Sequence, residues 1–167
     1  SLYAVTKRSN ELMAESYFNL YNLNSIGLRF FTVYGPMGRP DMAIWKFTES
    51  IINNKAIEVF NRGNLSRDFT YIDDIINGLV ATSNLVPSRP PDEPNKSISP
   101  PYQIFNIGNG RPVELLEMIK ILENALGRKA KLNFMPRQPG DVRDTHANIE
   151  LLEKVTGYRP KTDLETG

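Results

Sequence analysis

The sequence has no cysteine and a single histidine, His146. These absences exclude disulfide frameworks, Cys-His zinc sites and thiol nucleophiles, and they argue against a Ser-His-Asp triad. We expect His146 to be a structural or surface residue and predict no metal site. Tyrosine, lysine and carboxylate side chains are left to carry any chemistry.

An excess of charge of one sign is also missing, because 20 basic and 19 acidic side chains give the 167 residues a net charge of +1. This balance predicts neither nucleic acid nor a membrane surface as a partner. No window approaches the roughly 18 apolar residues of a membrane span. No basic segment followed by an apolar run opens the chain. We therefore expect a cytoplasmic protein, whose 40% hydrophobic residues suffice for a globular core.

An initiator methionine and a leading strand are missing as well. The sequence starts at Ser1 and enters a helical pattern at once. We therefore expect this chain to be a piece of a longer one.

Hydrophobic spacing predicts a mixed α/β protein with short connections. Helices are predicted over 3–21, 42–53 and 149–155. A further helix is predicted to begin at a cap formed by Asp73 or Asp74, and another to run from Pro112 in its first turn to a stop at Gly127. Strands are predicted over 26–31, 57–60, 69–72, 102–107 and 131–135, with a turn at 61–64. Six of the twelve prolines fall in 87–101, which predicts a surface loop over 86–101.

Tyr3 and Lys7 are four residues apart on the first predicted helix, so their side chains leave the same face. A free tyrosine has a pKa of about 10, and a neighbouring ammonium favours the phenolate. The pair suits proton transfer. A surface contact within the helix is the alternative interpretation.

Four segments, in the same order, resemble the extended short-chain dehydrogenase/reductases of the NAD-dependent epimerase/dehydratase family. They are SLYAVTK at 1–7 with NELM at 10–13, FFTVYGP at 30–36, RDFTYIDD at 67–74 and PGDV at 139–142. Within that family, GPMGRPDM at 35–42 is most similar to UDP-glucuronate 4-epimerases.

The resemblance implies the C-terminal part of a Rossmann-type doubly wound sheet plus a small α/β substrate-binding domain. Residues 1–41 would be the tail of the dinucleotide-binding domain with the catalytic helix. Residues 42–167 would be mainly the nucleotide-sugar-binding domain, with some segments returning to the first domain. The glycine-rich turn that holds the NAD pyrophosphate is absent from the sequence.

The resemblance also implies a mechanism. Tyr3 would take the proton of the sugar 4-hydroxyl while hydride leaves C4 for NAD, and Lys7 would hold the nicotinamide ribose. Phe30 and Val33 would flank the nicotinamide. A 4-keto intermediate would connect UDP-glucuronate with UDP-galacturonate. The family's Ser/Thr partner of the tyrosine precedes it and is absent. Because the NAD pyrophosphate site is not encoded here, we expect this chain alone to be inactive.

The resemblance implies the following substrate-binding residues: Thr32, Arg39, Val59, Phe60, Arg67, Gln138 and Asp141. Arg39 would meet the C6 carboxylate, or would be a solvated loop residue. Arg67 would bind the UDP diphosphate, or would pair with Asp68 at the surface. Val59 and Phe60 would line the uracil, or would only end a buried strand. Gln138 stands where several related epimerases have arginine.

Three alternatives stay open at this point. A UDP-sugar dehydratase or a UDP-glucuronate decarboxylase of the same family would share Tyr3, Lys7 and Arg67. The third alternative is a non-catalytic piece that binds a nucleotide sugar or oligomerises. The resemblance places the first helix in a dimer contact, so we expect a homo-oligomer through that helix.

Overall fold

The computed structural model describes residues 2–85, 102–138 and 142–167 of the chain. The helices are α1 (Leu2–Tyr21), α2 (Ala43–Ile52), α3 (Ile72–Ser83), α4 (Leu115–Leu126) and α5 (Glu150–Thr156), with a 3₁₀ turn at Phe60–Gly63. The strands are β1 (Ser25–Phe30), β2 (Thr32–Tyr34), β3 (Ala56–Val59), β4 (Ser66–Arg67), β5 (Phe69–Tyr71), β6 (Tyr102–Ile107), β7 (Val113–Glu114) and β8 (Lys131–Phe134).

The strands form two-stranded pairs, and three of the pairs are parallel. These are β1 with β6, β2 with β5 and β3 with β8, whereas β4 and β7 are antiparallel. Parallel pairs joined by helices are typical of α/β folds. The predicted α/β class is therefore confirmed.

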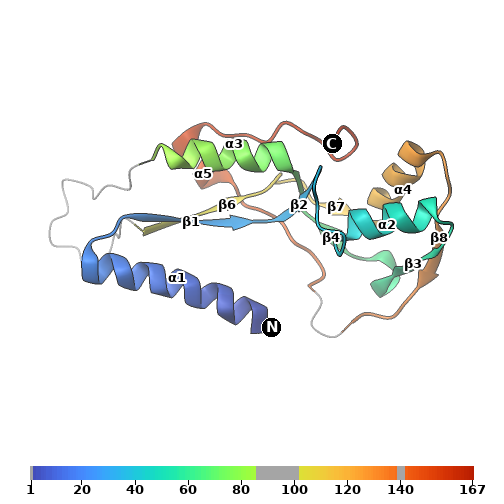
Figure 1. The fold of residues 1–167 in the computed structure, drawn as a ribbon, viewed down its shortest axis with the longest axis horizontal. Coiled ribbons are helices and arrows are strands. Elements are labelled where there is room, and N and C mark those ends of the chain that lie inside the picture. The colour runs from blue at the N-terminus through green and yellow to red at the C-terminus, as the bar shows by residue number, and fades with distance from the viewer. Residues whose placement is uncertain (1, 86–101, 139–141) are drawn as a thin grey trace.

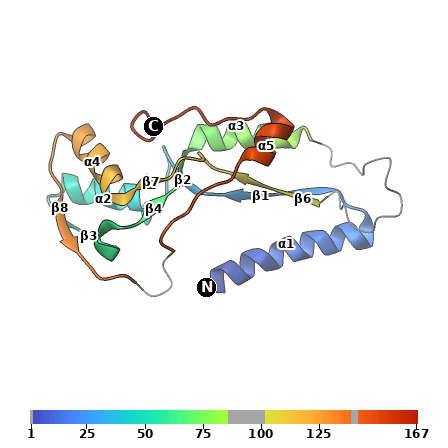
Figure 2. The same cartoon turned by 180° about the vertical axis from the view of Figure 1, so that it is seen from behind.

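The β1–β6 pair lies between helices. Figures 1 and 2 show α1 along one face of the pair and α3 with α5 on the other. A buried cluster fills the α3 side and consists of Ile75, Phe105, Ile107, Leu152 and Tyr158. The alternating burial of β6 places Phe105 and Ile107 on this side, as period-two side-chain geometry requires.

A second core lies at the other end of the molecule, between the β3–β8 pair and helices α2 and α4 (Figure 1). Its buried members are Ile51, Ile57, Val59 and Ile119. Each such side chain contributes about 1.5 to 3 kcal/mol on burial. The molecule thus has two hydrophobic centres that are connected through β2, β5, β4 and β7.

Asp68 joins the segments between these centres. It lies between β4 and β5 and is 0% exposed. Its carboxylate accepts hydrogen bonds from the backbone N–H groups of Asn109 at 2.7 Å, Gly110 at 2.9 Å and Ala147 at 2.9 Å. Gly108 permits the close approach, because a Cβ there would lie 2.3 Å from that of Ala147. One buried carboxylate therefore holds three distant parts of the chain together.

Two details of the predicted helix starts are wrong. Pro112 is not in the first turn of α4, because Val113 and Glu114 first pair with β4 as a short strand. Neither Asp73 nor Asp74 caps α3, whose N-cap residue is Tyr71 and has no side-chain cap. Asp74 is buried and accepts the backbone N–H groups of Lys161 and Thr162 at 3.2 and 2.9 Å. Asp74 therefore bonds to the distant C-terminal backbone instead of to the N–H groups at the start of its own helix.

Other boundaries differ less. The chain remains extended through β2, beyond the end of the strand predicted over 26–31, because Thr32 to Tyr34 pair with β5. The strand predicted over 57–60 ends one residue early, and Phe60 begins the 3₁₀ turn. Gly127 stops α4 in the left-handed conformation, as predicted. The loop predicted over 86–101 lies outside the described residues.

We expect Asp68→Ala to lower the free energy of unfolding by about 3 to 5 kcal/mol, because three buried or partly buried N–H groups lose their acceptor. Urea unfolding of the chain measures this change. The matched control is Asp73→Asn, an exposed carboxylate in the first turn of α3, for which a change below about 1 kcal/mol is expected. A loss below about 1 kcal/mol for Asp68→Ala would show that the junction does not depend on this carboxylate.

Candidate active site

A cavity of about 840 Å³ opens where α1, the end of β1, β2 and the loop after β2 meet. Five of the residues proposed from the sequence line it together: Tyr3, Phe30, Thr32, Val33 and Arg39. Other lining residues are Arg29, Phe31, Tyr34, Gly35, Pro36, Met37, Gly38, Met42, Ile72 and Thr145. The cavity thus collects side chains from segments more than a hundred residues apart.

Tyr3 and Lys7 do meet on α1. The Lys7 Nζ lies 5.4 Å from the centre of the Tyr3 ring, within the range of a cation–π contact. Tyr3 is 70% exposed and lines the cavity mouth. Lys7 is not among the cavity-lining residues, but it lies beside the Tyr3 phenol, which can exchange a proton with a hydroxyl group bound in the cavity.

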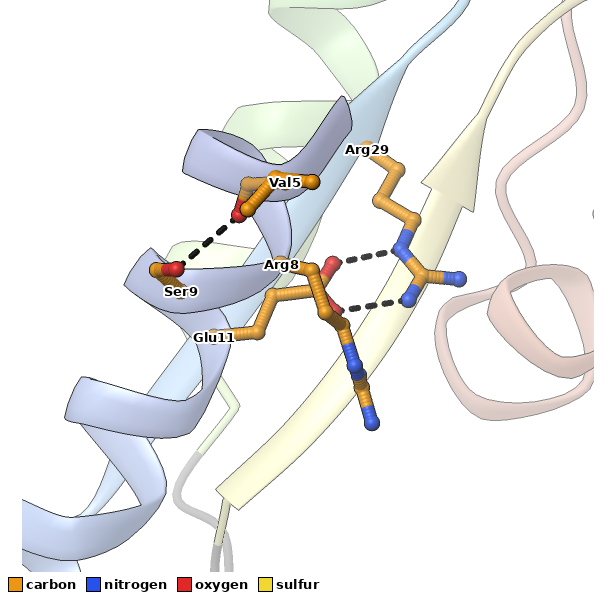
Figure 3. A network of polar contacts seen from close by, with 5 residues as sticks. All are labelled: Val5, Arg8, Ser9, Glu11 and Arg29. Atoms are coloured by element: carbon orange, nitrogen blue, oxygen red, sulfur yellow. Dashed lines mark hydrogen bonds and ion pairs between the residues drawn. The ribbon is translucent and has the colours of Figure 1, made fainter. Parts of the chain in front are cut away.

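An ion pair fixes α1 against the sheet. Arg29 of β1 donates from Nε and Nη2 to the two carboxylate oxygens of Glu11 at 2.6 and 2.8 Å (Figure 3). Arg8 donates to the same carboxylate at 2.6 Å. Within the helix, the Ser9 hydroxyl donates to the carbonyl of Val5. The hydrogen bond from Arg29 is the main reason that the pKa of Glu11 falls from 4.5 to about 2. The pair sets the position of the helix that carries Tyr3.

The wall of the cavity is formed by β1 and β2. Thr32 donates its backbone N–H to the Asp68 carbonyl at 3.1 Å, which places the strand relative to the buried junction. Val33 packs against the core beside α3, while Phe30 remains about half exposed. Thr32 therefore contributes a hydroxyl, and Phe30 an apolar ring, to an otherwise rigid wall.

Tyr34 is the partly buried back of the cavity. Its hydroxyl donates to the carbonyl of Asp163 at 3.1 Å, and burial is the main cause that raises the pKa of Tyr34 to about 12. This phenol stays protonated and acts as a structural donor. The following Gly35 has φ +137° and no room for a Cβ, which would lie 2.7 Å from Cγ2 of Ile72.

Arg39 lies on the loop that follows. Its guanidinium pairs with Asp41, with Nε to Oδ1 at 3.0 Å and Nη2 to Oδ2 at 2.5 Å. These hydrogen bonds raise the pKa of Arg39 and lower that of Asp41, so both groups are charged. Two backbone bonds shape the loop, from Gly38 N to Gly35 O and from Met42 N to Arg39 O.

Arg67 lies outside this cavity lining. Its Nη1 donates to the carbonyls of Ser66 and Arg143, both at 2.9 Å. Asp68 points into the buried junction, so a surface pair of Arg67 with Asp68 is the wrong alternative. Arg67 links β4 to the segment that supplies Thr145 to the cavity.

The remaining proposed residues are dispersed. Val59 is 0% exposed in the second core, and Phe60 is partly buried at the start of the 3₁₀ turn. Gln138 is exposed, and Asp141 lies outside the described residues. The His146 Nε2 lies 3.2 Å from the carbonyl of Gly110.

Sequence reasoning missed Asp41, the partner of the cavity residue Arg39, and two residues that line the cavity, Thr145 and Ile72. Asp41 stands inside the GPMGRPDM segment, and a carboxylate two residues from an arginine was a readable signal. Thr145 and Ile72 had none, because only the fold brings their segments beside β2. In the part of the chain that the structure describes, no three His, Asp or Glu side chains form a metal-binding group. No described helix is both long and apolar enough to cross a membrane.

Comparison with known proteins identifies the family. Residues 1–108 match the NAD dependent epimerase/dehydratase family, and this span is more than half of the chain. The chain belongs to this family. The family predicted from the four ordered segments is therefore confirmed. NAD, the predicted cofactor, is the one on which this family depends.

Three similar members of the family show what the chain covers. Protein CapI of Staphylococcus aureus is 51% identical over 177 residues, which include all of this chain and 52% of CapI. A probable UDP-glucuronate 4-epimerase of Rhizobium meliloti is 45% identical over all of this chain and 51% of its own length. The crystal structure of the UDP-glucuronic acid 4-epimerase of Bacillus cereus, with UDP-glucuronic acid and NAD, has a TM-score of 0.86 and 34% identity. The alignment covers all of this chain and 50% of the Bacillus cereus chain. The chain thus spans about half the length of these relatives.

We expect Glu11→Gln to lower the free energy of unfolding at pH 7 by about 1 kcal/mol, because Arg29 is 50% exposed and solvent weakens the pair. The pKa of Glu11 is depressed in the folded state, so its contribution is complete above pH 4.5 and is lost as the pH falls toward about 2. Urea unfolding of both proteins between pH 7 and 3 measures the difference.

Glu15→Gln on the same helix is the control, since no ion pair to Glu15 is found among the described residues. Its difference from the parent should not vary in the same way with pH. A difference for Glu11→Gln that stays constant down to pH 3 would contradict the ion pair.

Proposed function

We propose that this chain is the C-terminal, substrate-binding half of an NAD-dependent nucleotide-sugar epimerase that interconverts UDP-glucuronate and UDP-galacturonate. The observation that carries the proposal is the single cavity that brings together Tyr3, Thr32 and Arg39. The Rhizobium meliloti and Bacillus cereus relatives are named as UDP-glucuronate 4-epimerases, which supports UDP-glucuronate as the substrate. The proposal places the protein in the cytoplasm.

The residues of the cavity suit the chemistry. Tyr3 takes the proton from the sugar 4-hydroxyl and later returns it, and Lys7 supplies the neighbouring positive charge. Thr32 positions the sugar by a hydrogen bond, and Arg39 meets the C6 carboxylate. Tyr3, Thr32 and Arg39 line the cavity, and Lys7 lies beside the Tyr3 ring.

The exposed side chains of Tyr3 and Phe30 fit the nicotinamide end of NAD, and Val33 supports the same wall from the core side. Lys7 would hold the nicotinamide ribose. NAD, when bound, accepts and returns the hydride of the sugar C4. The glycine-rich turn for its pyrophosphate is not part of this sequence, so the remaining half of the enzyme has to supply that turn.

The UDP moiety is proposed to bind beside the second core. Arg67 and Gln138 would contact the diphosphate, and Asp141 would bind the same substrate. Phe60 would line the uracil with its ring. The side chain of Val59 is buried, so only its backbone is available to the base.

Tyr3→Phe tests the proton-transfer role. The chain is produced with the unmatched half of the Rhizobium meliloti relative placed upstream of Ser1, and conversion of UDP-glucuronate is followed with NAD. We expect turnover to fall by a factor on the order of 10² to 10⁴, with UDP affinity unchanged. Tyr17→Phe, on the same helix, is the control and should keep full turnover, since Tyr17 does not line the cavity.

The products separate the related reactions. With UDP-glucuronate as the substrate, UDP-galacturonate supports the epimerase and a UDP-pentose would indicate a decarboxylase. A dehydratase removes a C6 hydroxyl as water, so a 4-keto-6-deoxy sugar formed in a parallel assay with UDP-glucose would indicate a dehydratase. The 167-residue chain alone should show no conversion with added NAD, and conversion by that chain would contradict the proposed division of labour. An equal loss of UDP affinity in Tyr3→Phe would make Tyr3 a structural residue.

Arg39→Ala tests the carboxylate contact in the same assembled enzyme. A charge-assisted contact contributes about 1.5 to 3 kcal/mol, so the Kd for UDP-glucuronate should rise by a factor on the order of 10 to 100. The Kd for UDP should stay the same. Titration calorimetry with both ligands measures the two values, and equal effects on them would return Arg39 to a solvated loop residue.

We also propose that the protein is a homo-oligomer through α1. The face of α1 turned away from the buried Phe18 carries exposed apolar side chains, including Leu2, Val5, Leu12 and Leu20. An exposed apolar surface of this kind is typical of a protein–protein interface. Sedimentation equilibrium should give the mass of a dimer or larger assembly for the unsubstituted protein and that of a monomer for Leu12→Glu. A monomeric mass for the unsubstituted protein would contradict the proposal.

A further inference from the structure

The pairing of Arg39 with Asp41 uses only one edge of the guanidinium. Asp41 occupies the edge formed by Nε and Nη2. A guanidinium has five N–H groups, so both hydrogens of Nη1 and the second hydrogen of Nη2 remain. The second hydrogen of Nη2 and one hydrogen of Nη1 form the edge at the end of the side chain, which has the geometry of a bidentate carboxylate site. Asp41 therefore leaves Arg39 able to bind another carboxylate.

The loop around the pair is held by its own backbone. Gly38 N–H donates to the Gly35 carbonyl at 3.1 Å, and Met42 N–H donates to the Arg39 carbonyl at 3.2 Å. The second of these bonds closes the backbone around Asp41, so the two side chains start from a defined separation. Gly35 is itself confined by Ile72. The loop thus places Arg39 in the cavity lining, with Asp41 paired to it.

We propose that Asp41 is a positioning residue that orients Arg39 so that its end edge receives the C6 carboxylate of a uronic acid. This inference rests on the proposed function, because it assumes that Arg39 meets that carboxylate. Asp41 would not touch the substrate. It would act through Arg39, and thereby favour nucleotide sugars with a charged C6 over those with a neutral one.

Exposure explains why such a device is needed. The side chains of Arg39 and Asp41 are 74% and 57% exposed, so core packing does not restrict the arginine rotamers. A free arginine side chain loses much rotamer freedom when it binds a ligand. Asp41 removes part of that freedom before binding, which is the general route by which preorganisation improves affinity.

The charges around the pair argue against a purely electrostatic role. Asp41 partly neutralises Arg39, and the field of Lys46 on α2 also reaches Asp41. Removal of Asp41 leaves Arg39 and Lys46 as uncompensated cations near the cavity, which attracts anions more strongly. If Asp41 acts by orienting Arg39, its removal lowers the affinity for the carboxylate. If Asp41 acts only through its charge, its removal raises that affinity.

The test is a double-mutant cycle in the assembled enzyme, with Arg39→Ala, Asp41→Ala and the double variant. The Kd values for UDP-glucuronate and for UDP are measured by titration calorimetry. We expect Asp41→Ala to raise the Kd for UDP-glucuronate by a factor on the order of five and to leave the Kd for UDP unchanged. In the Arg39→Ala background, Asp41→Ala should have no further effect, because Asp41 acts only through Arg39.

Two further variants serve as controls. Asp41→Asn keeps one acceptor oxygen for Arg39 and should recover part of the affinity. Glu49→Gln removes an exposed carboxylate from α2 without touching the pair and should leave both Kd values unchanged.

Each outcome has one meaning. A lower Kd in Asp41→Ala would identify Asp41 as a competitor of the substrate and overturn the inference. An unchanged Kd in Asp41→Ala, together with a raised one in Arg39→Ala, would overturn the inference and leave the proposed function intact. If Arg39→Ala changes neither ligand, the carboxylate contact itself fails, and the inference fails with it.

Discussion

The buried carboxylate of Asp68 is the interaction on which the arrangement of this molecule depends. It accepts three backbone N–H groups from two loops and sits between the strands that join the two cores. A buried charge is tolerated only where hydrogen bonds replace its lost hydration. The Gly108 turn and the segment around Ala147 therefore have to close on it. Since the Asp68 carbonyl also binds the Thr32 N–H, the cavity wall is placed by the same residue.

The cavity lies at the junction that Asp68 organises, and each wall has its own means of support. The Glu11–Arg29 ion pair sets α1, which carries Tyr3, and the partly buried Tyr34 fixes the strand end that leads to the Arg39 loop. Tyr3 and Arg39, which would do chemistry, are exposed, while the Glu11 carboxylate and Tyr34, which help to place them, are partly buried. A binding site on a rigid frame needs this division, because reactive groups have to reach a ligand.

Sequence reasoning recovered most of the elements, because helices and strands carry their own periodicity. Leu115 to Leu126 with Gly127 after it, and Tyr102 to Ile107, lie where spacing predicted them. The errors concern residues whose partners are distant. Asp74 was expected to cap its own helix and instead binds the backbone of Lys161 and Thr162. The short strands β4 and β7 exist only because the fold brings them together.

The sequence by itself determined the α/β class, the family and the pairing of Tyr3 with Lys7, because these depend on local spacing and on ordered motifs. The tertiary structure alone decided which candidate residues share a cavity. It joined Tyr3, Thr32 and Arg39 with Thr145, and placed Val59 in a core. It also showed that Arg39 is held by Asp41 and that Arg67 is bound to backbone carbonyls. The physical reason is that burial and hydrogen-bond partners arise from segments far apart in the chain, whose approach no local pattern records.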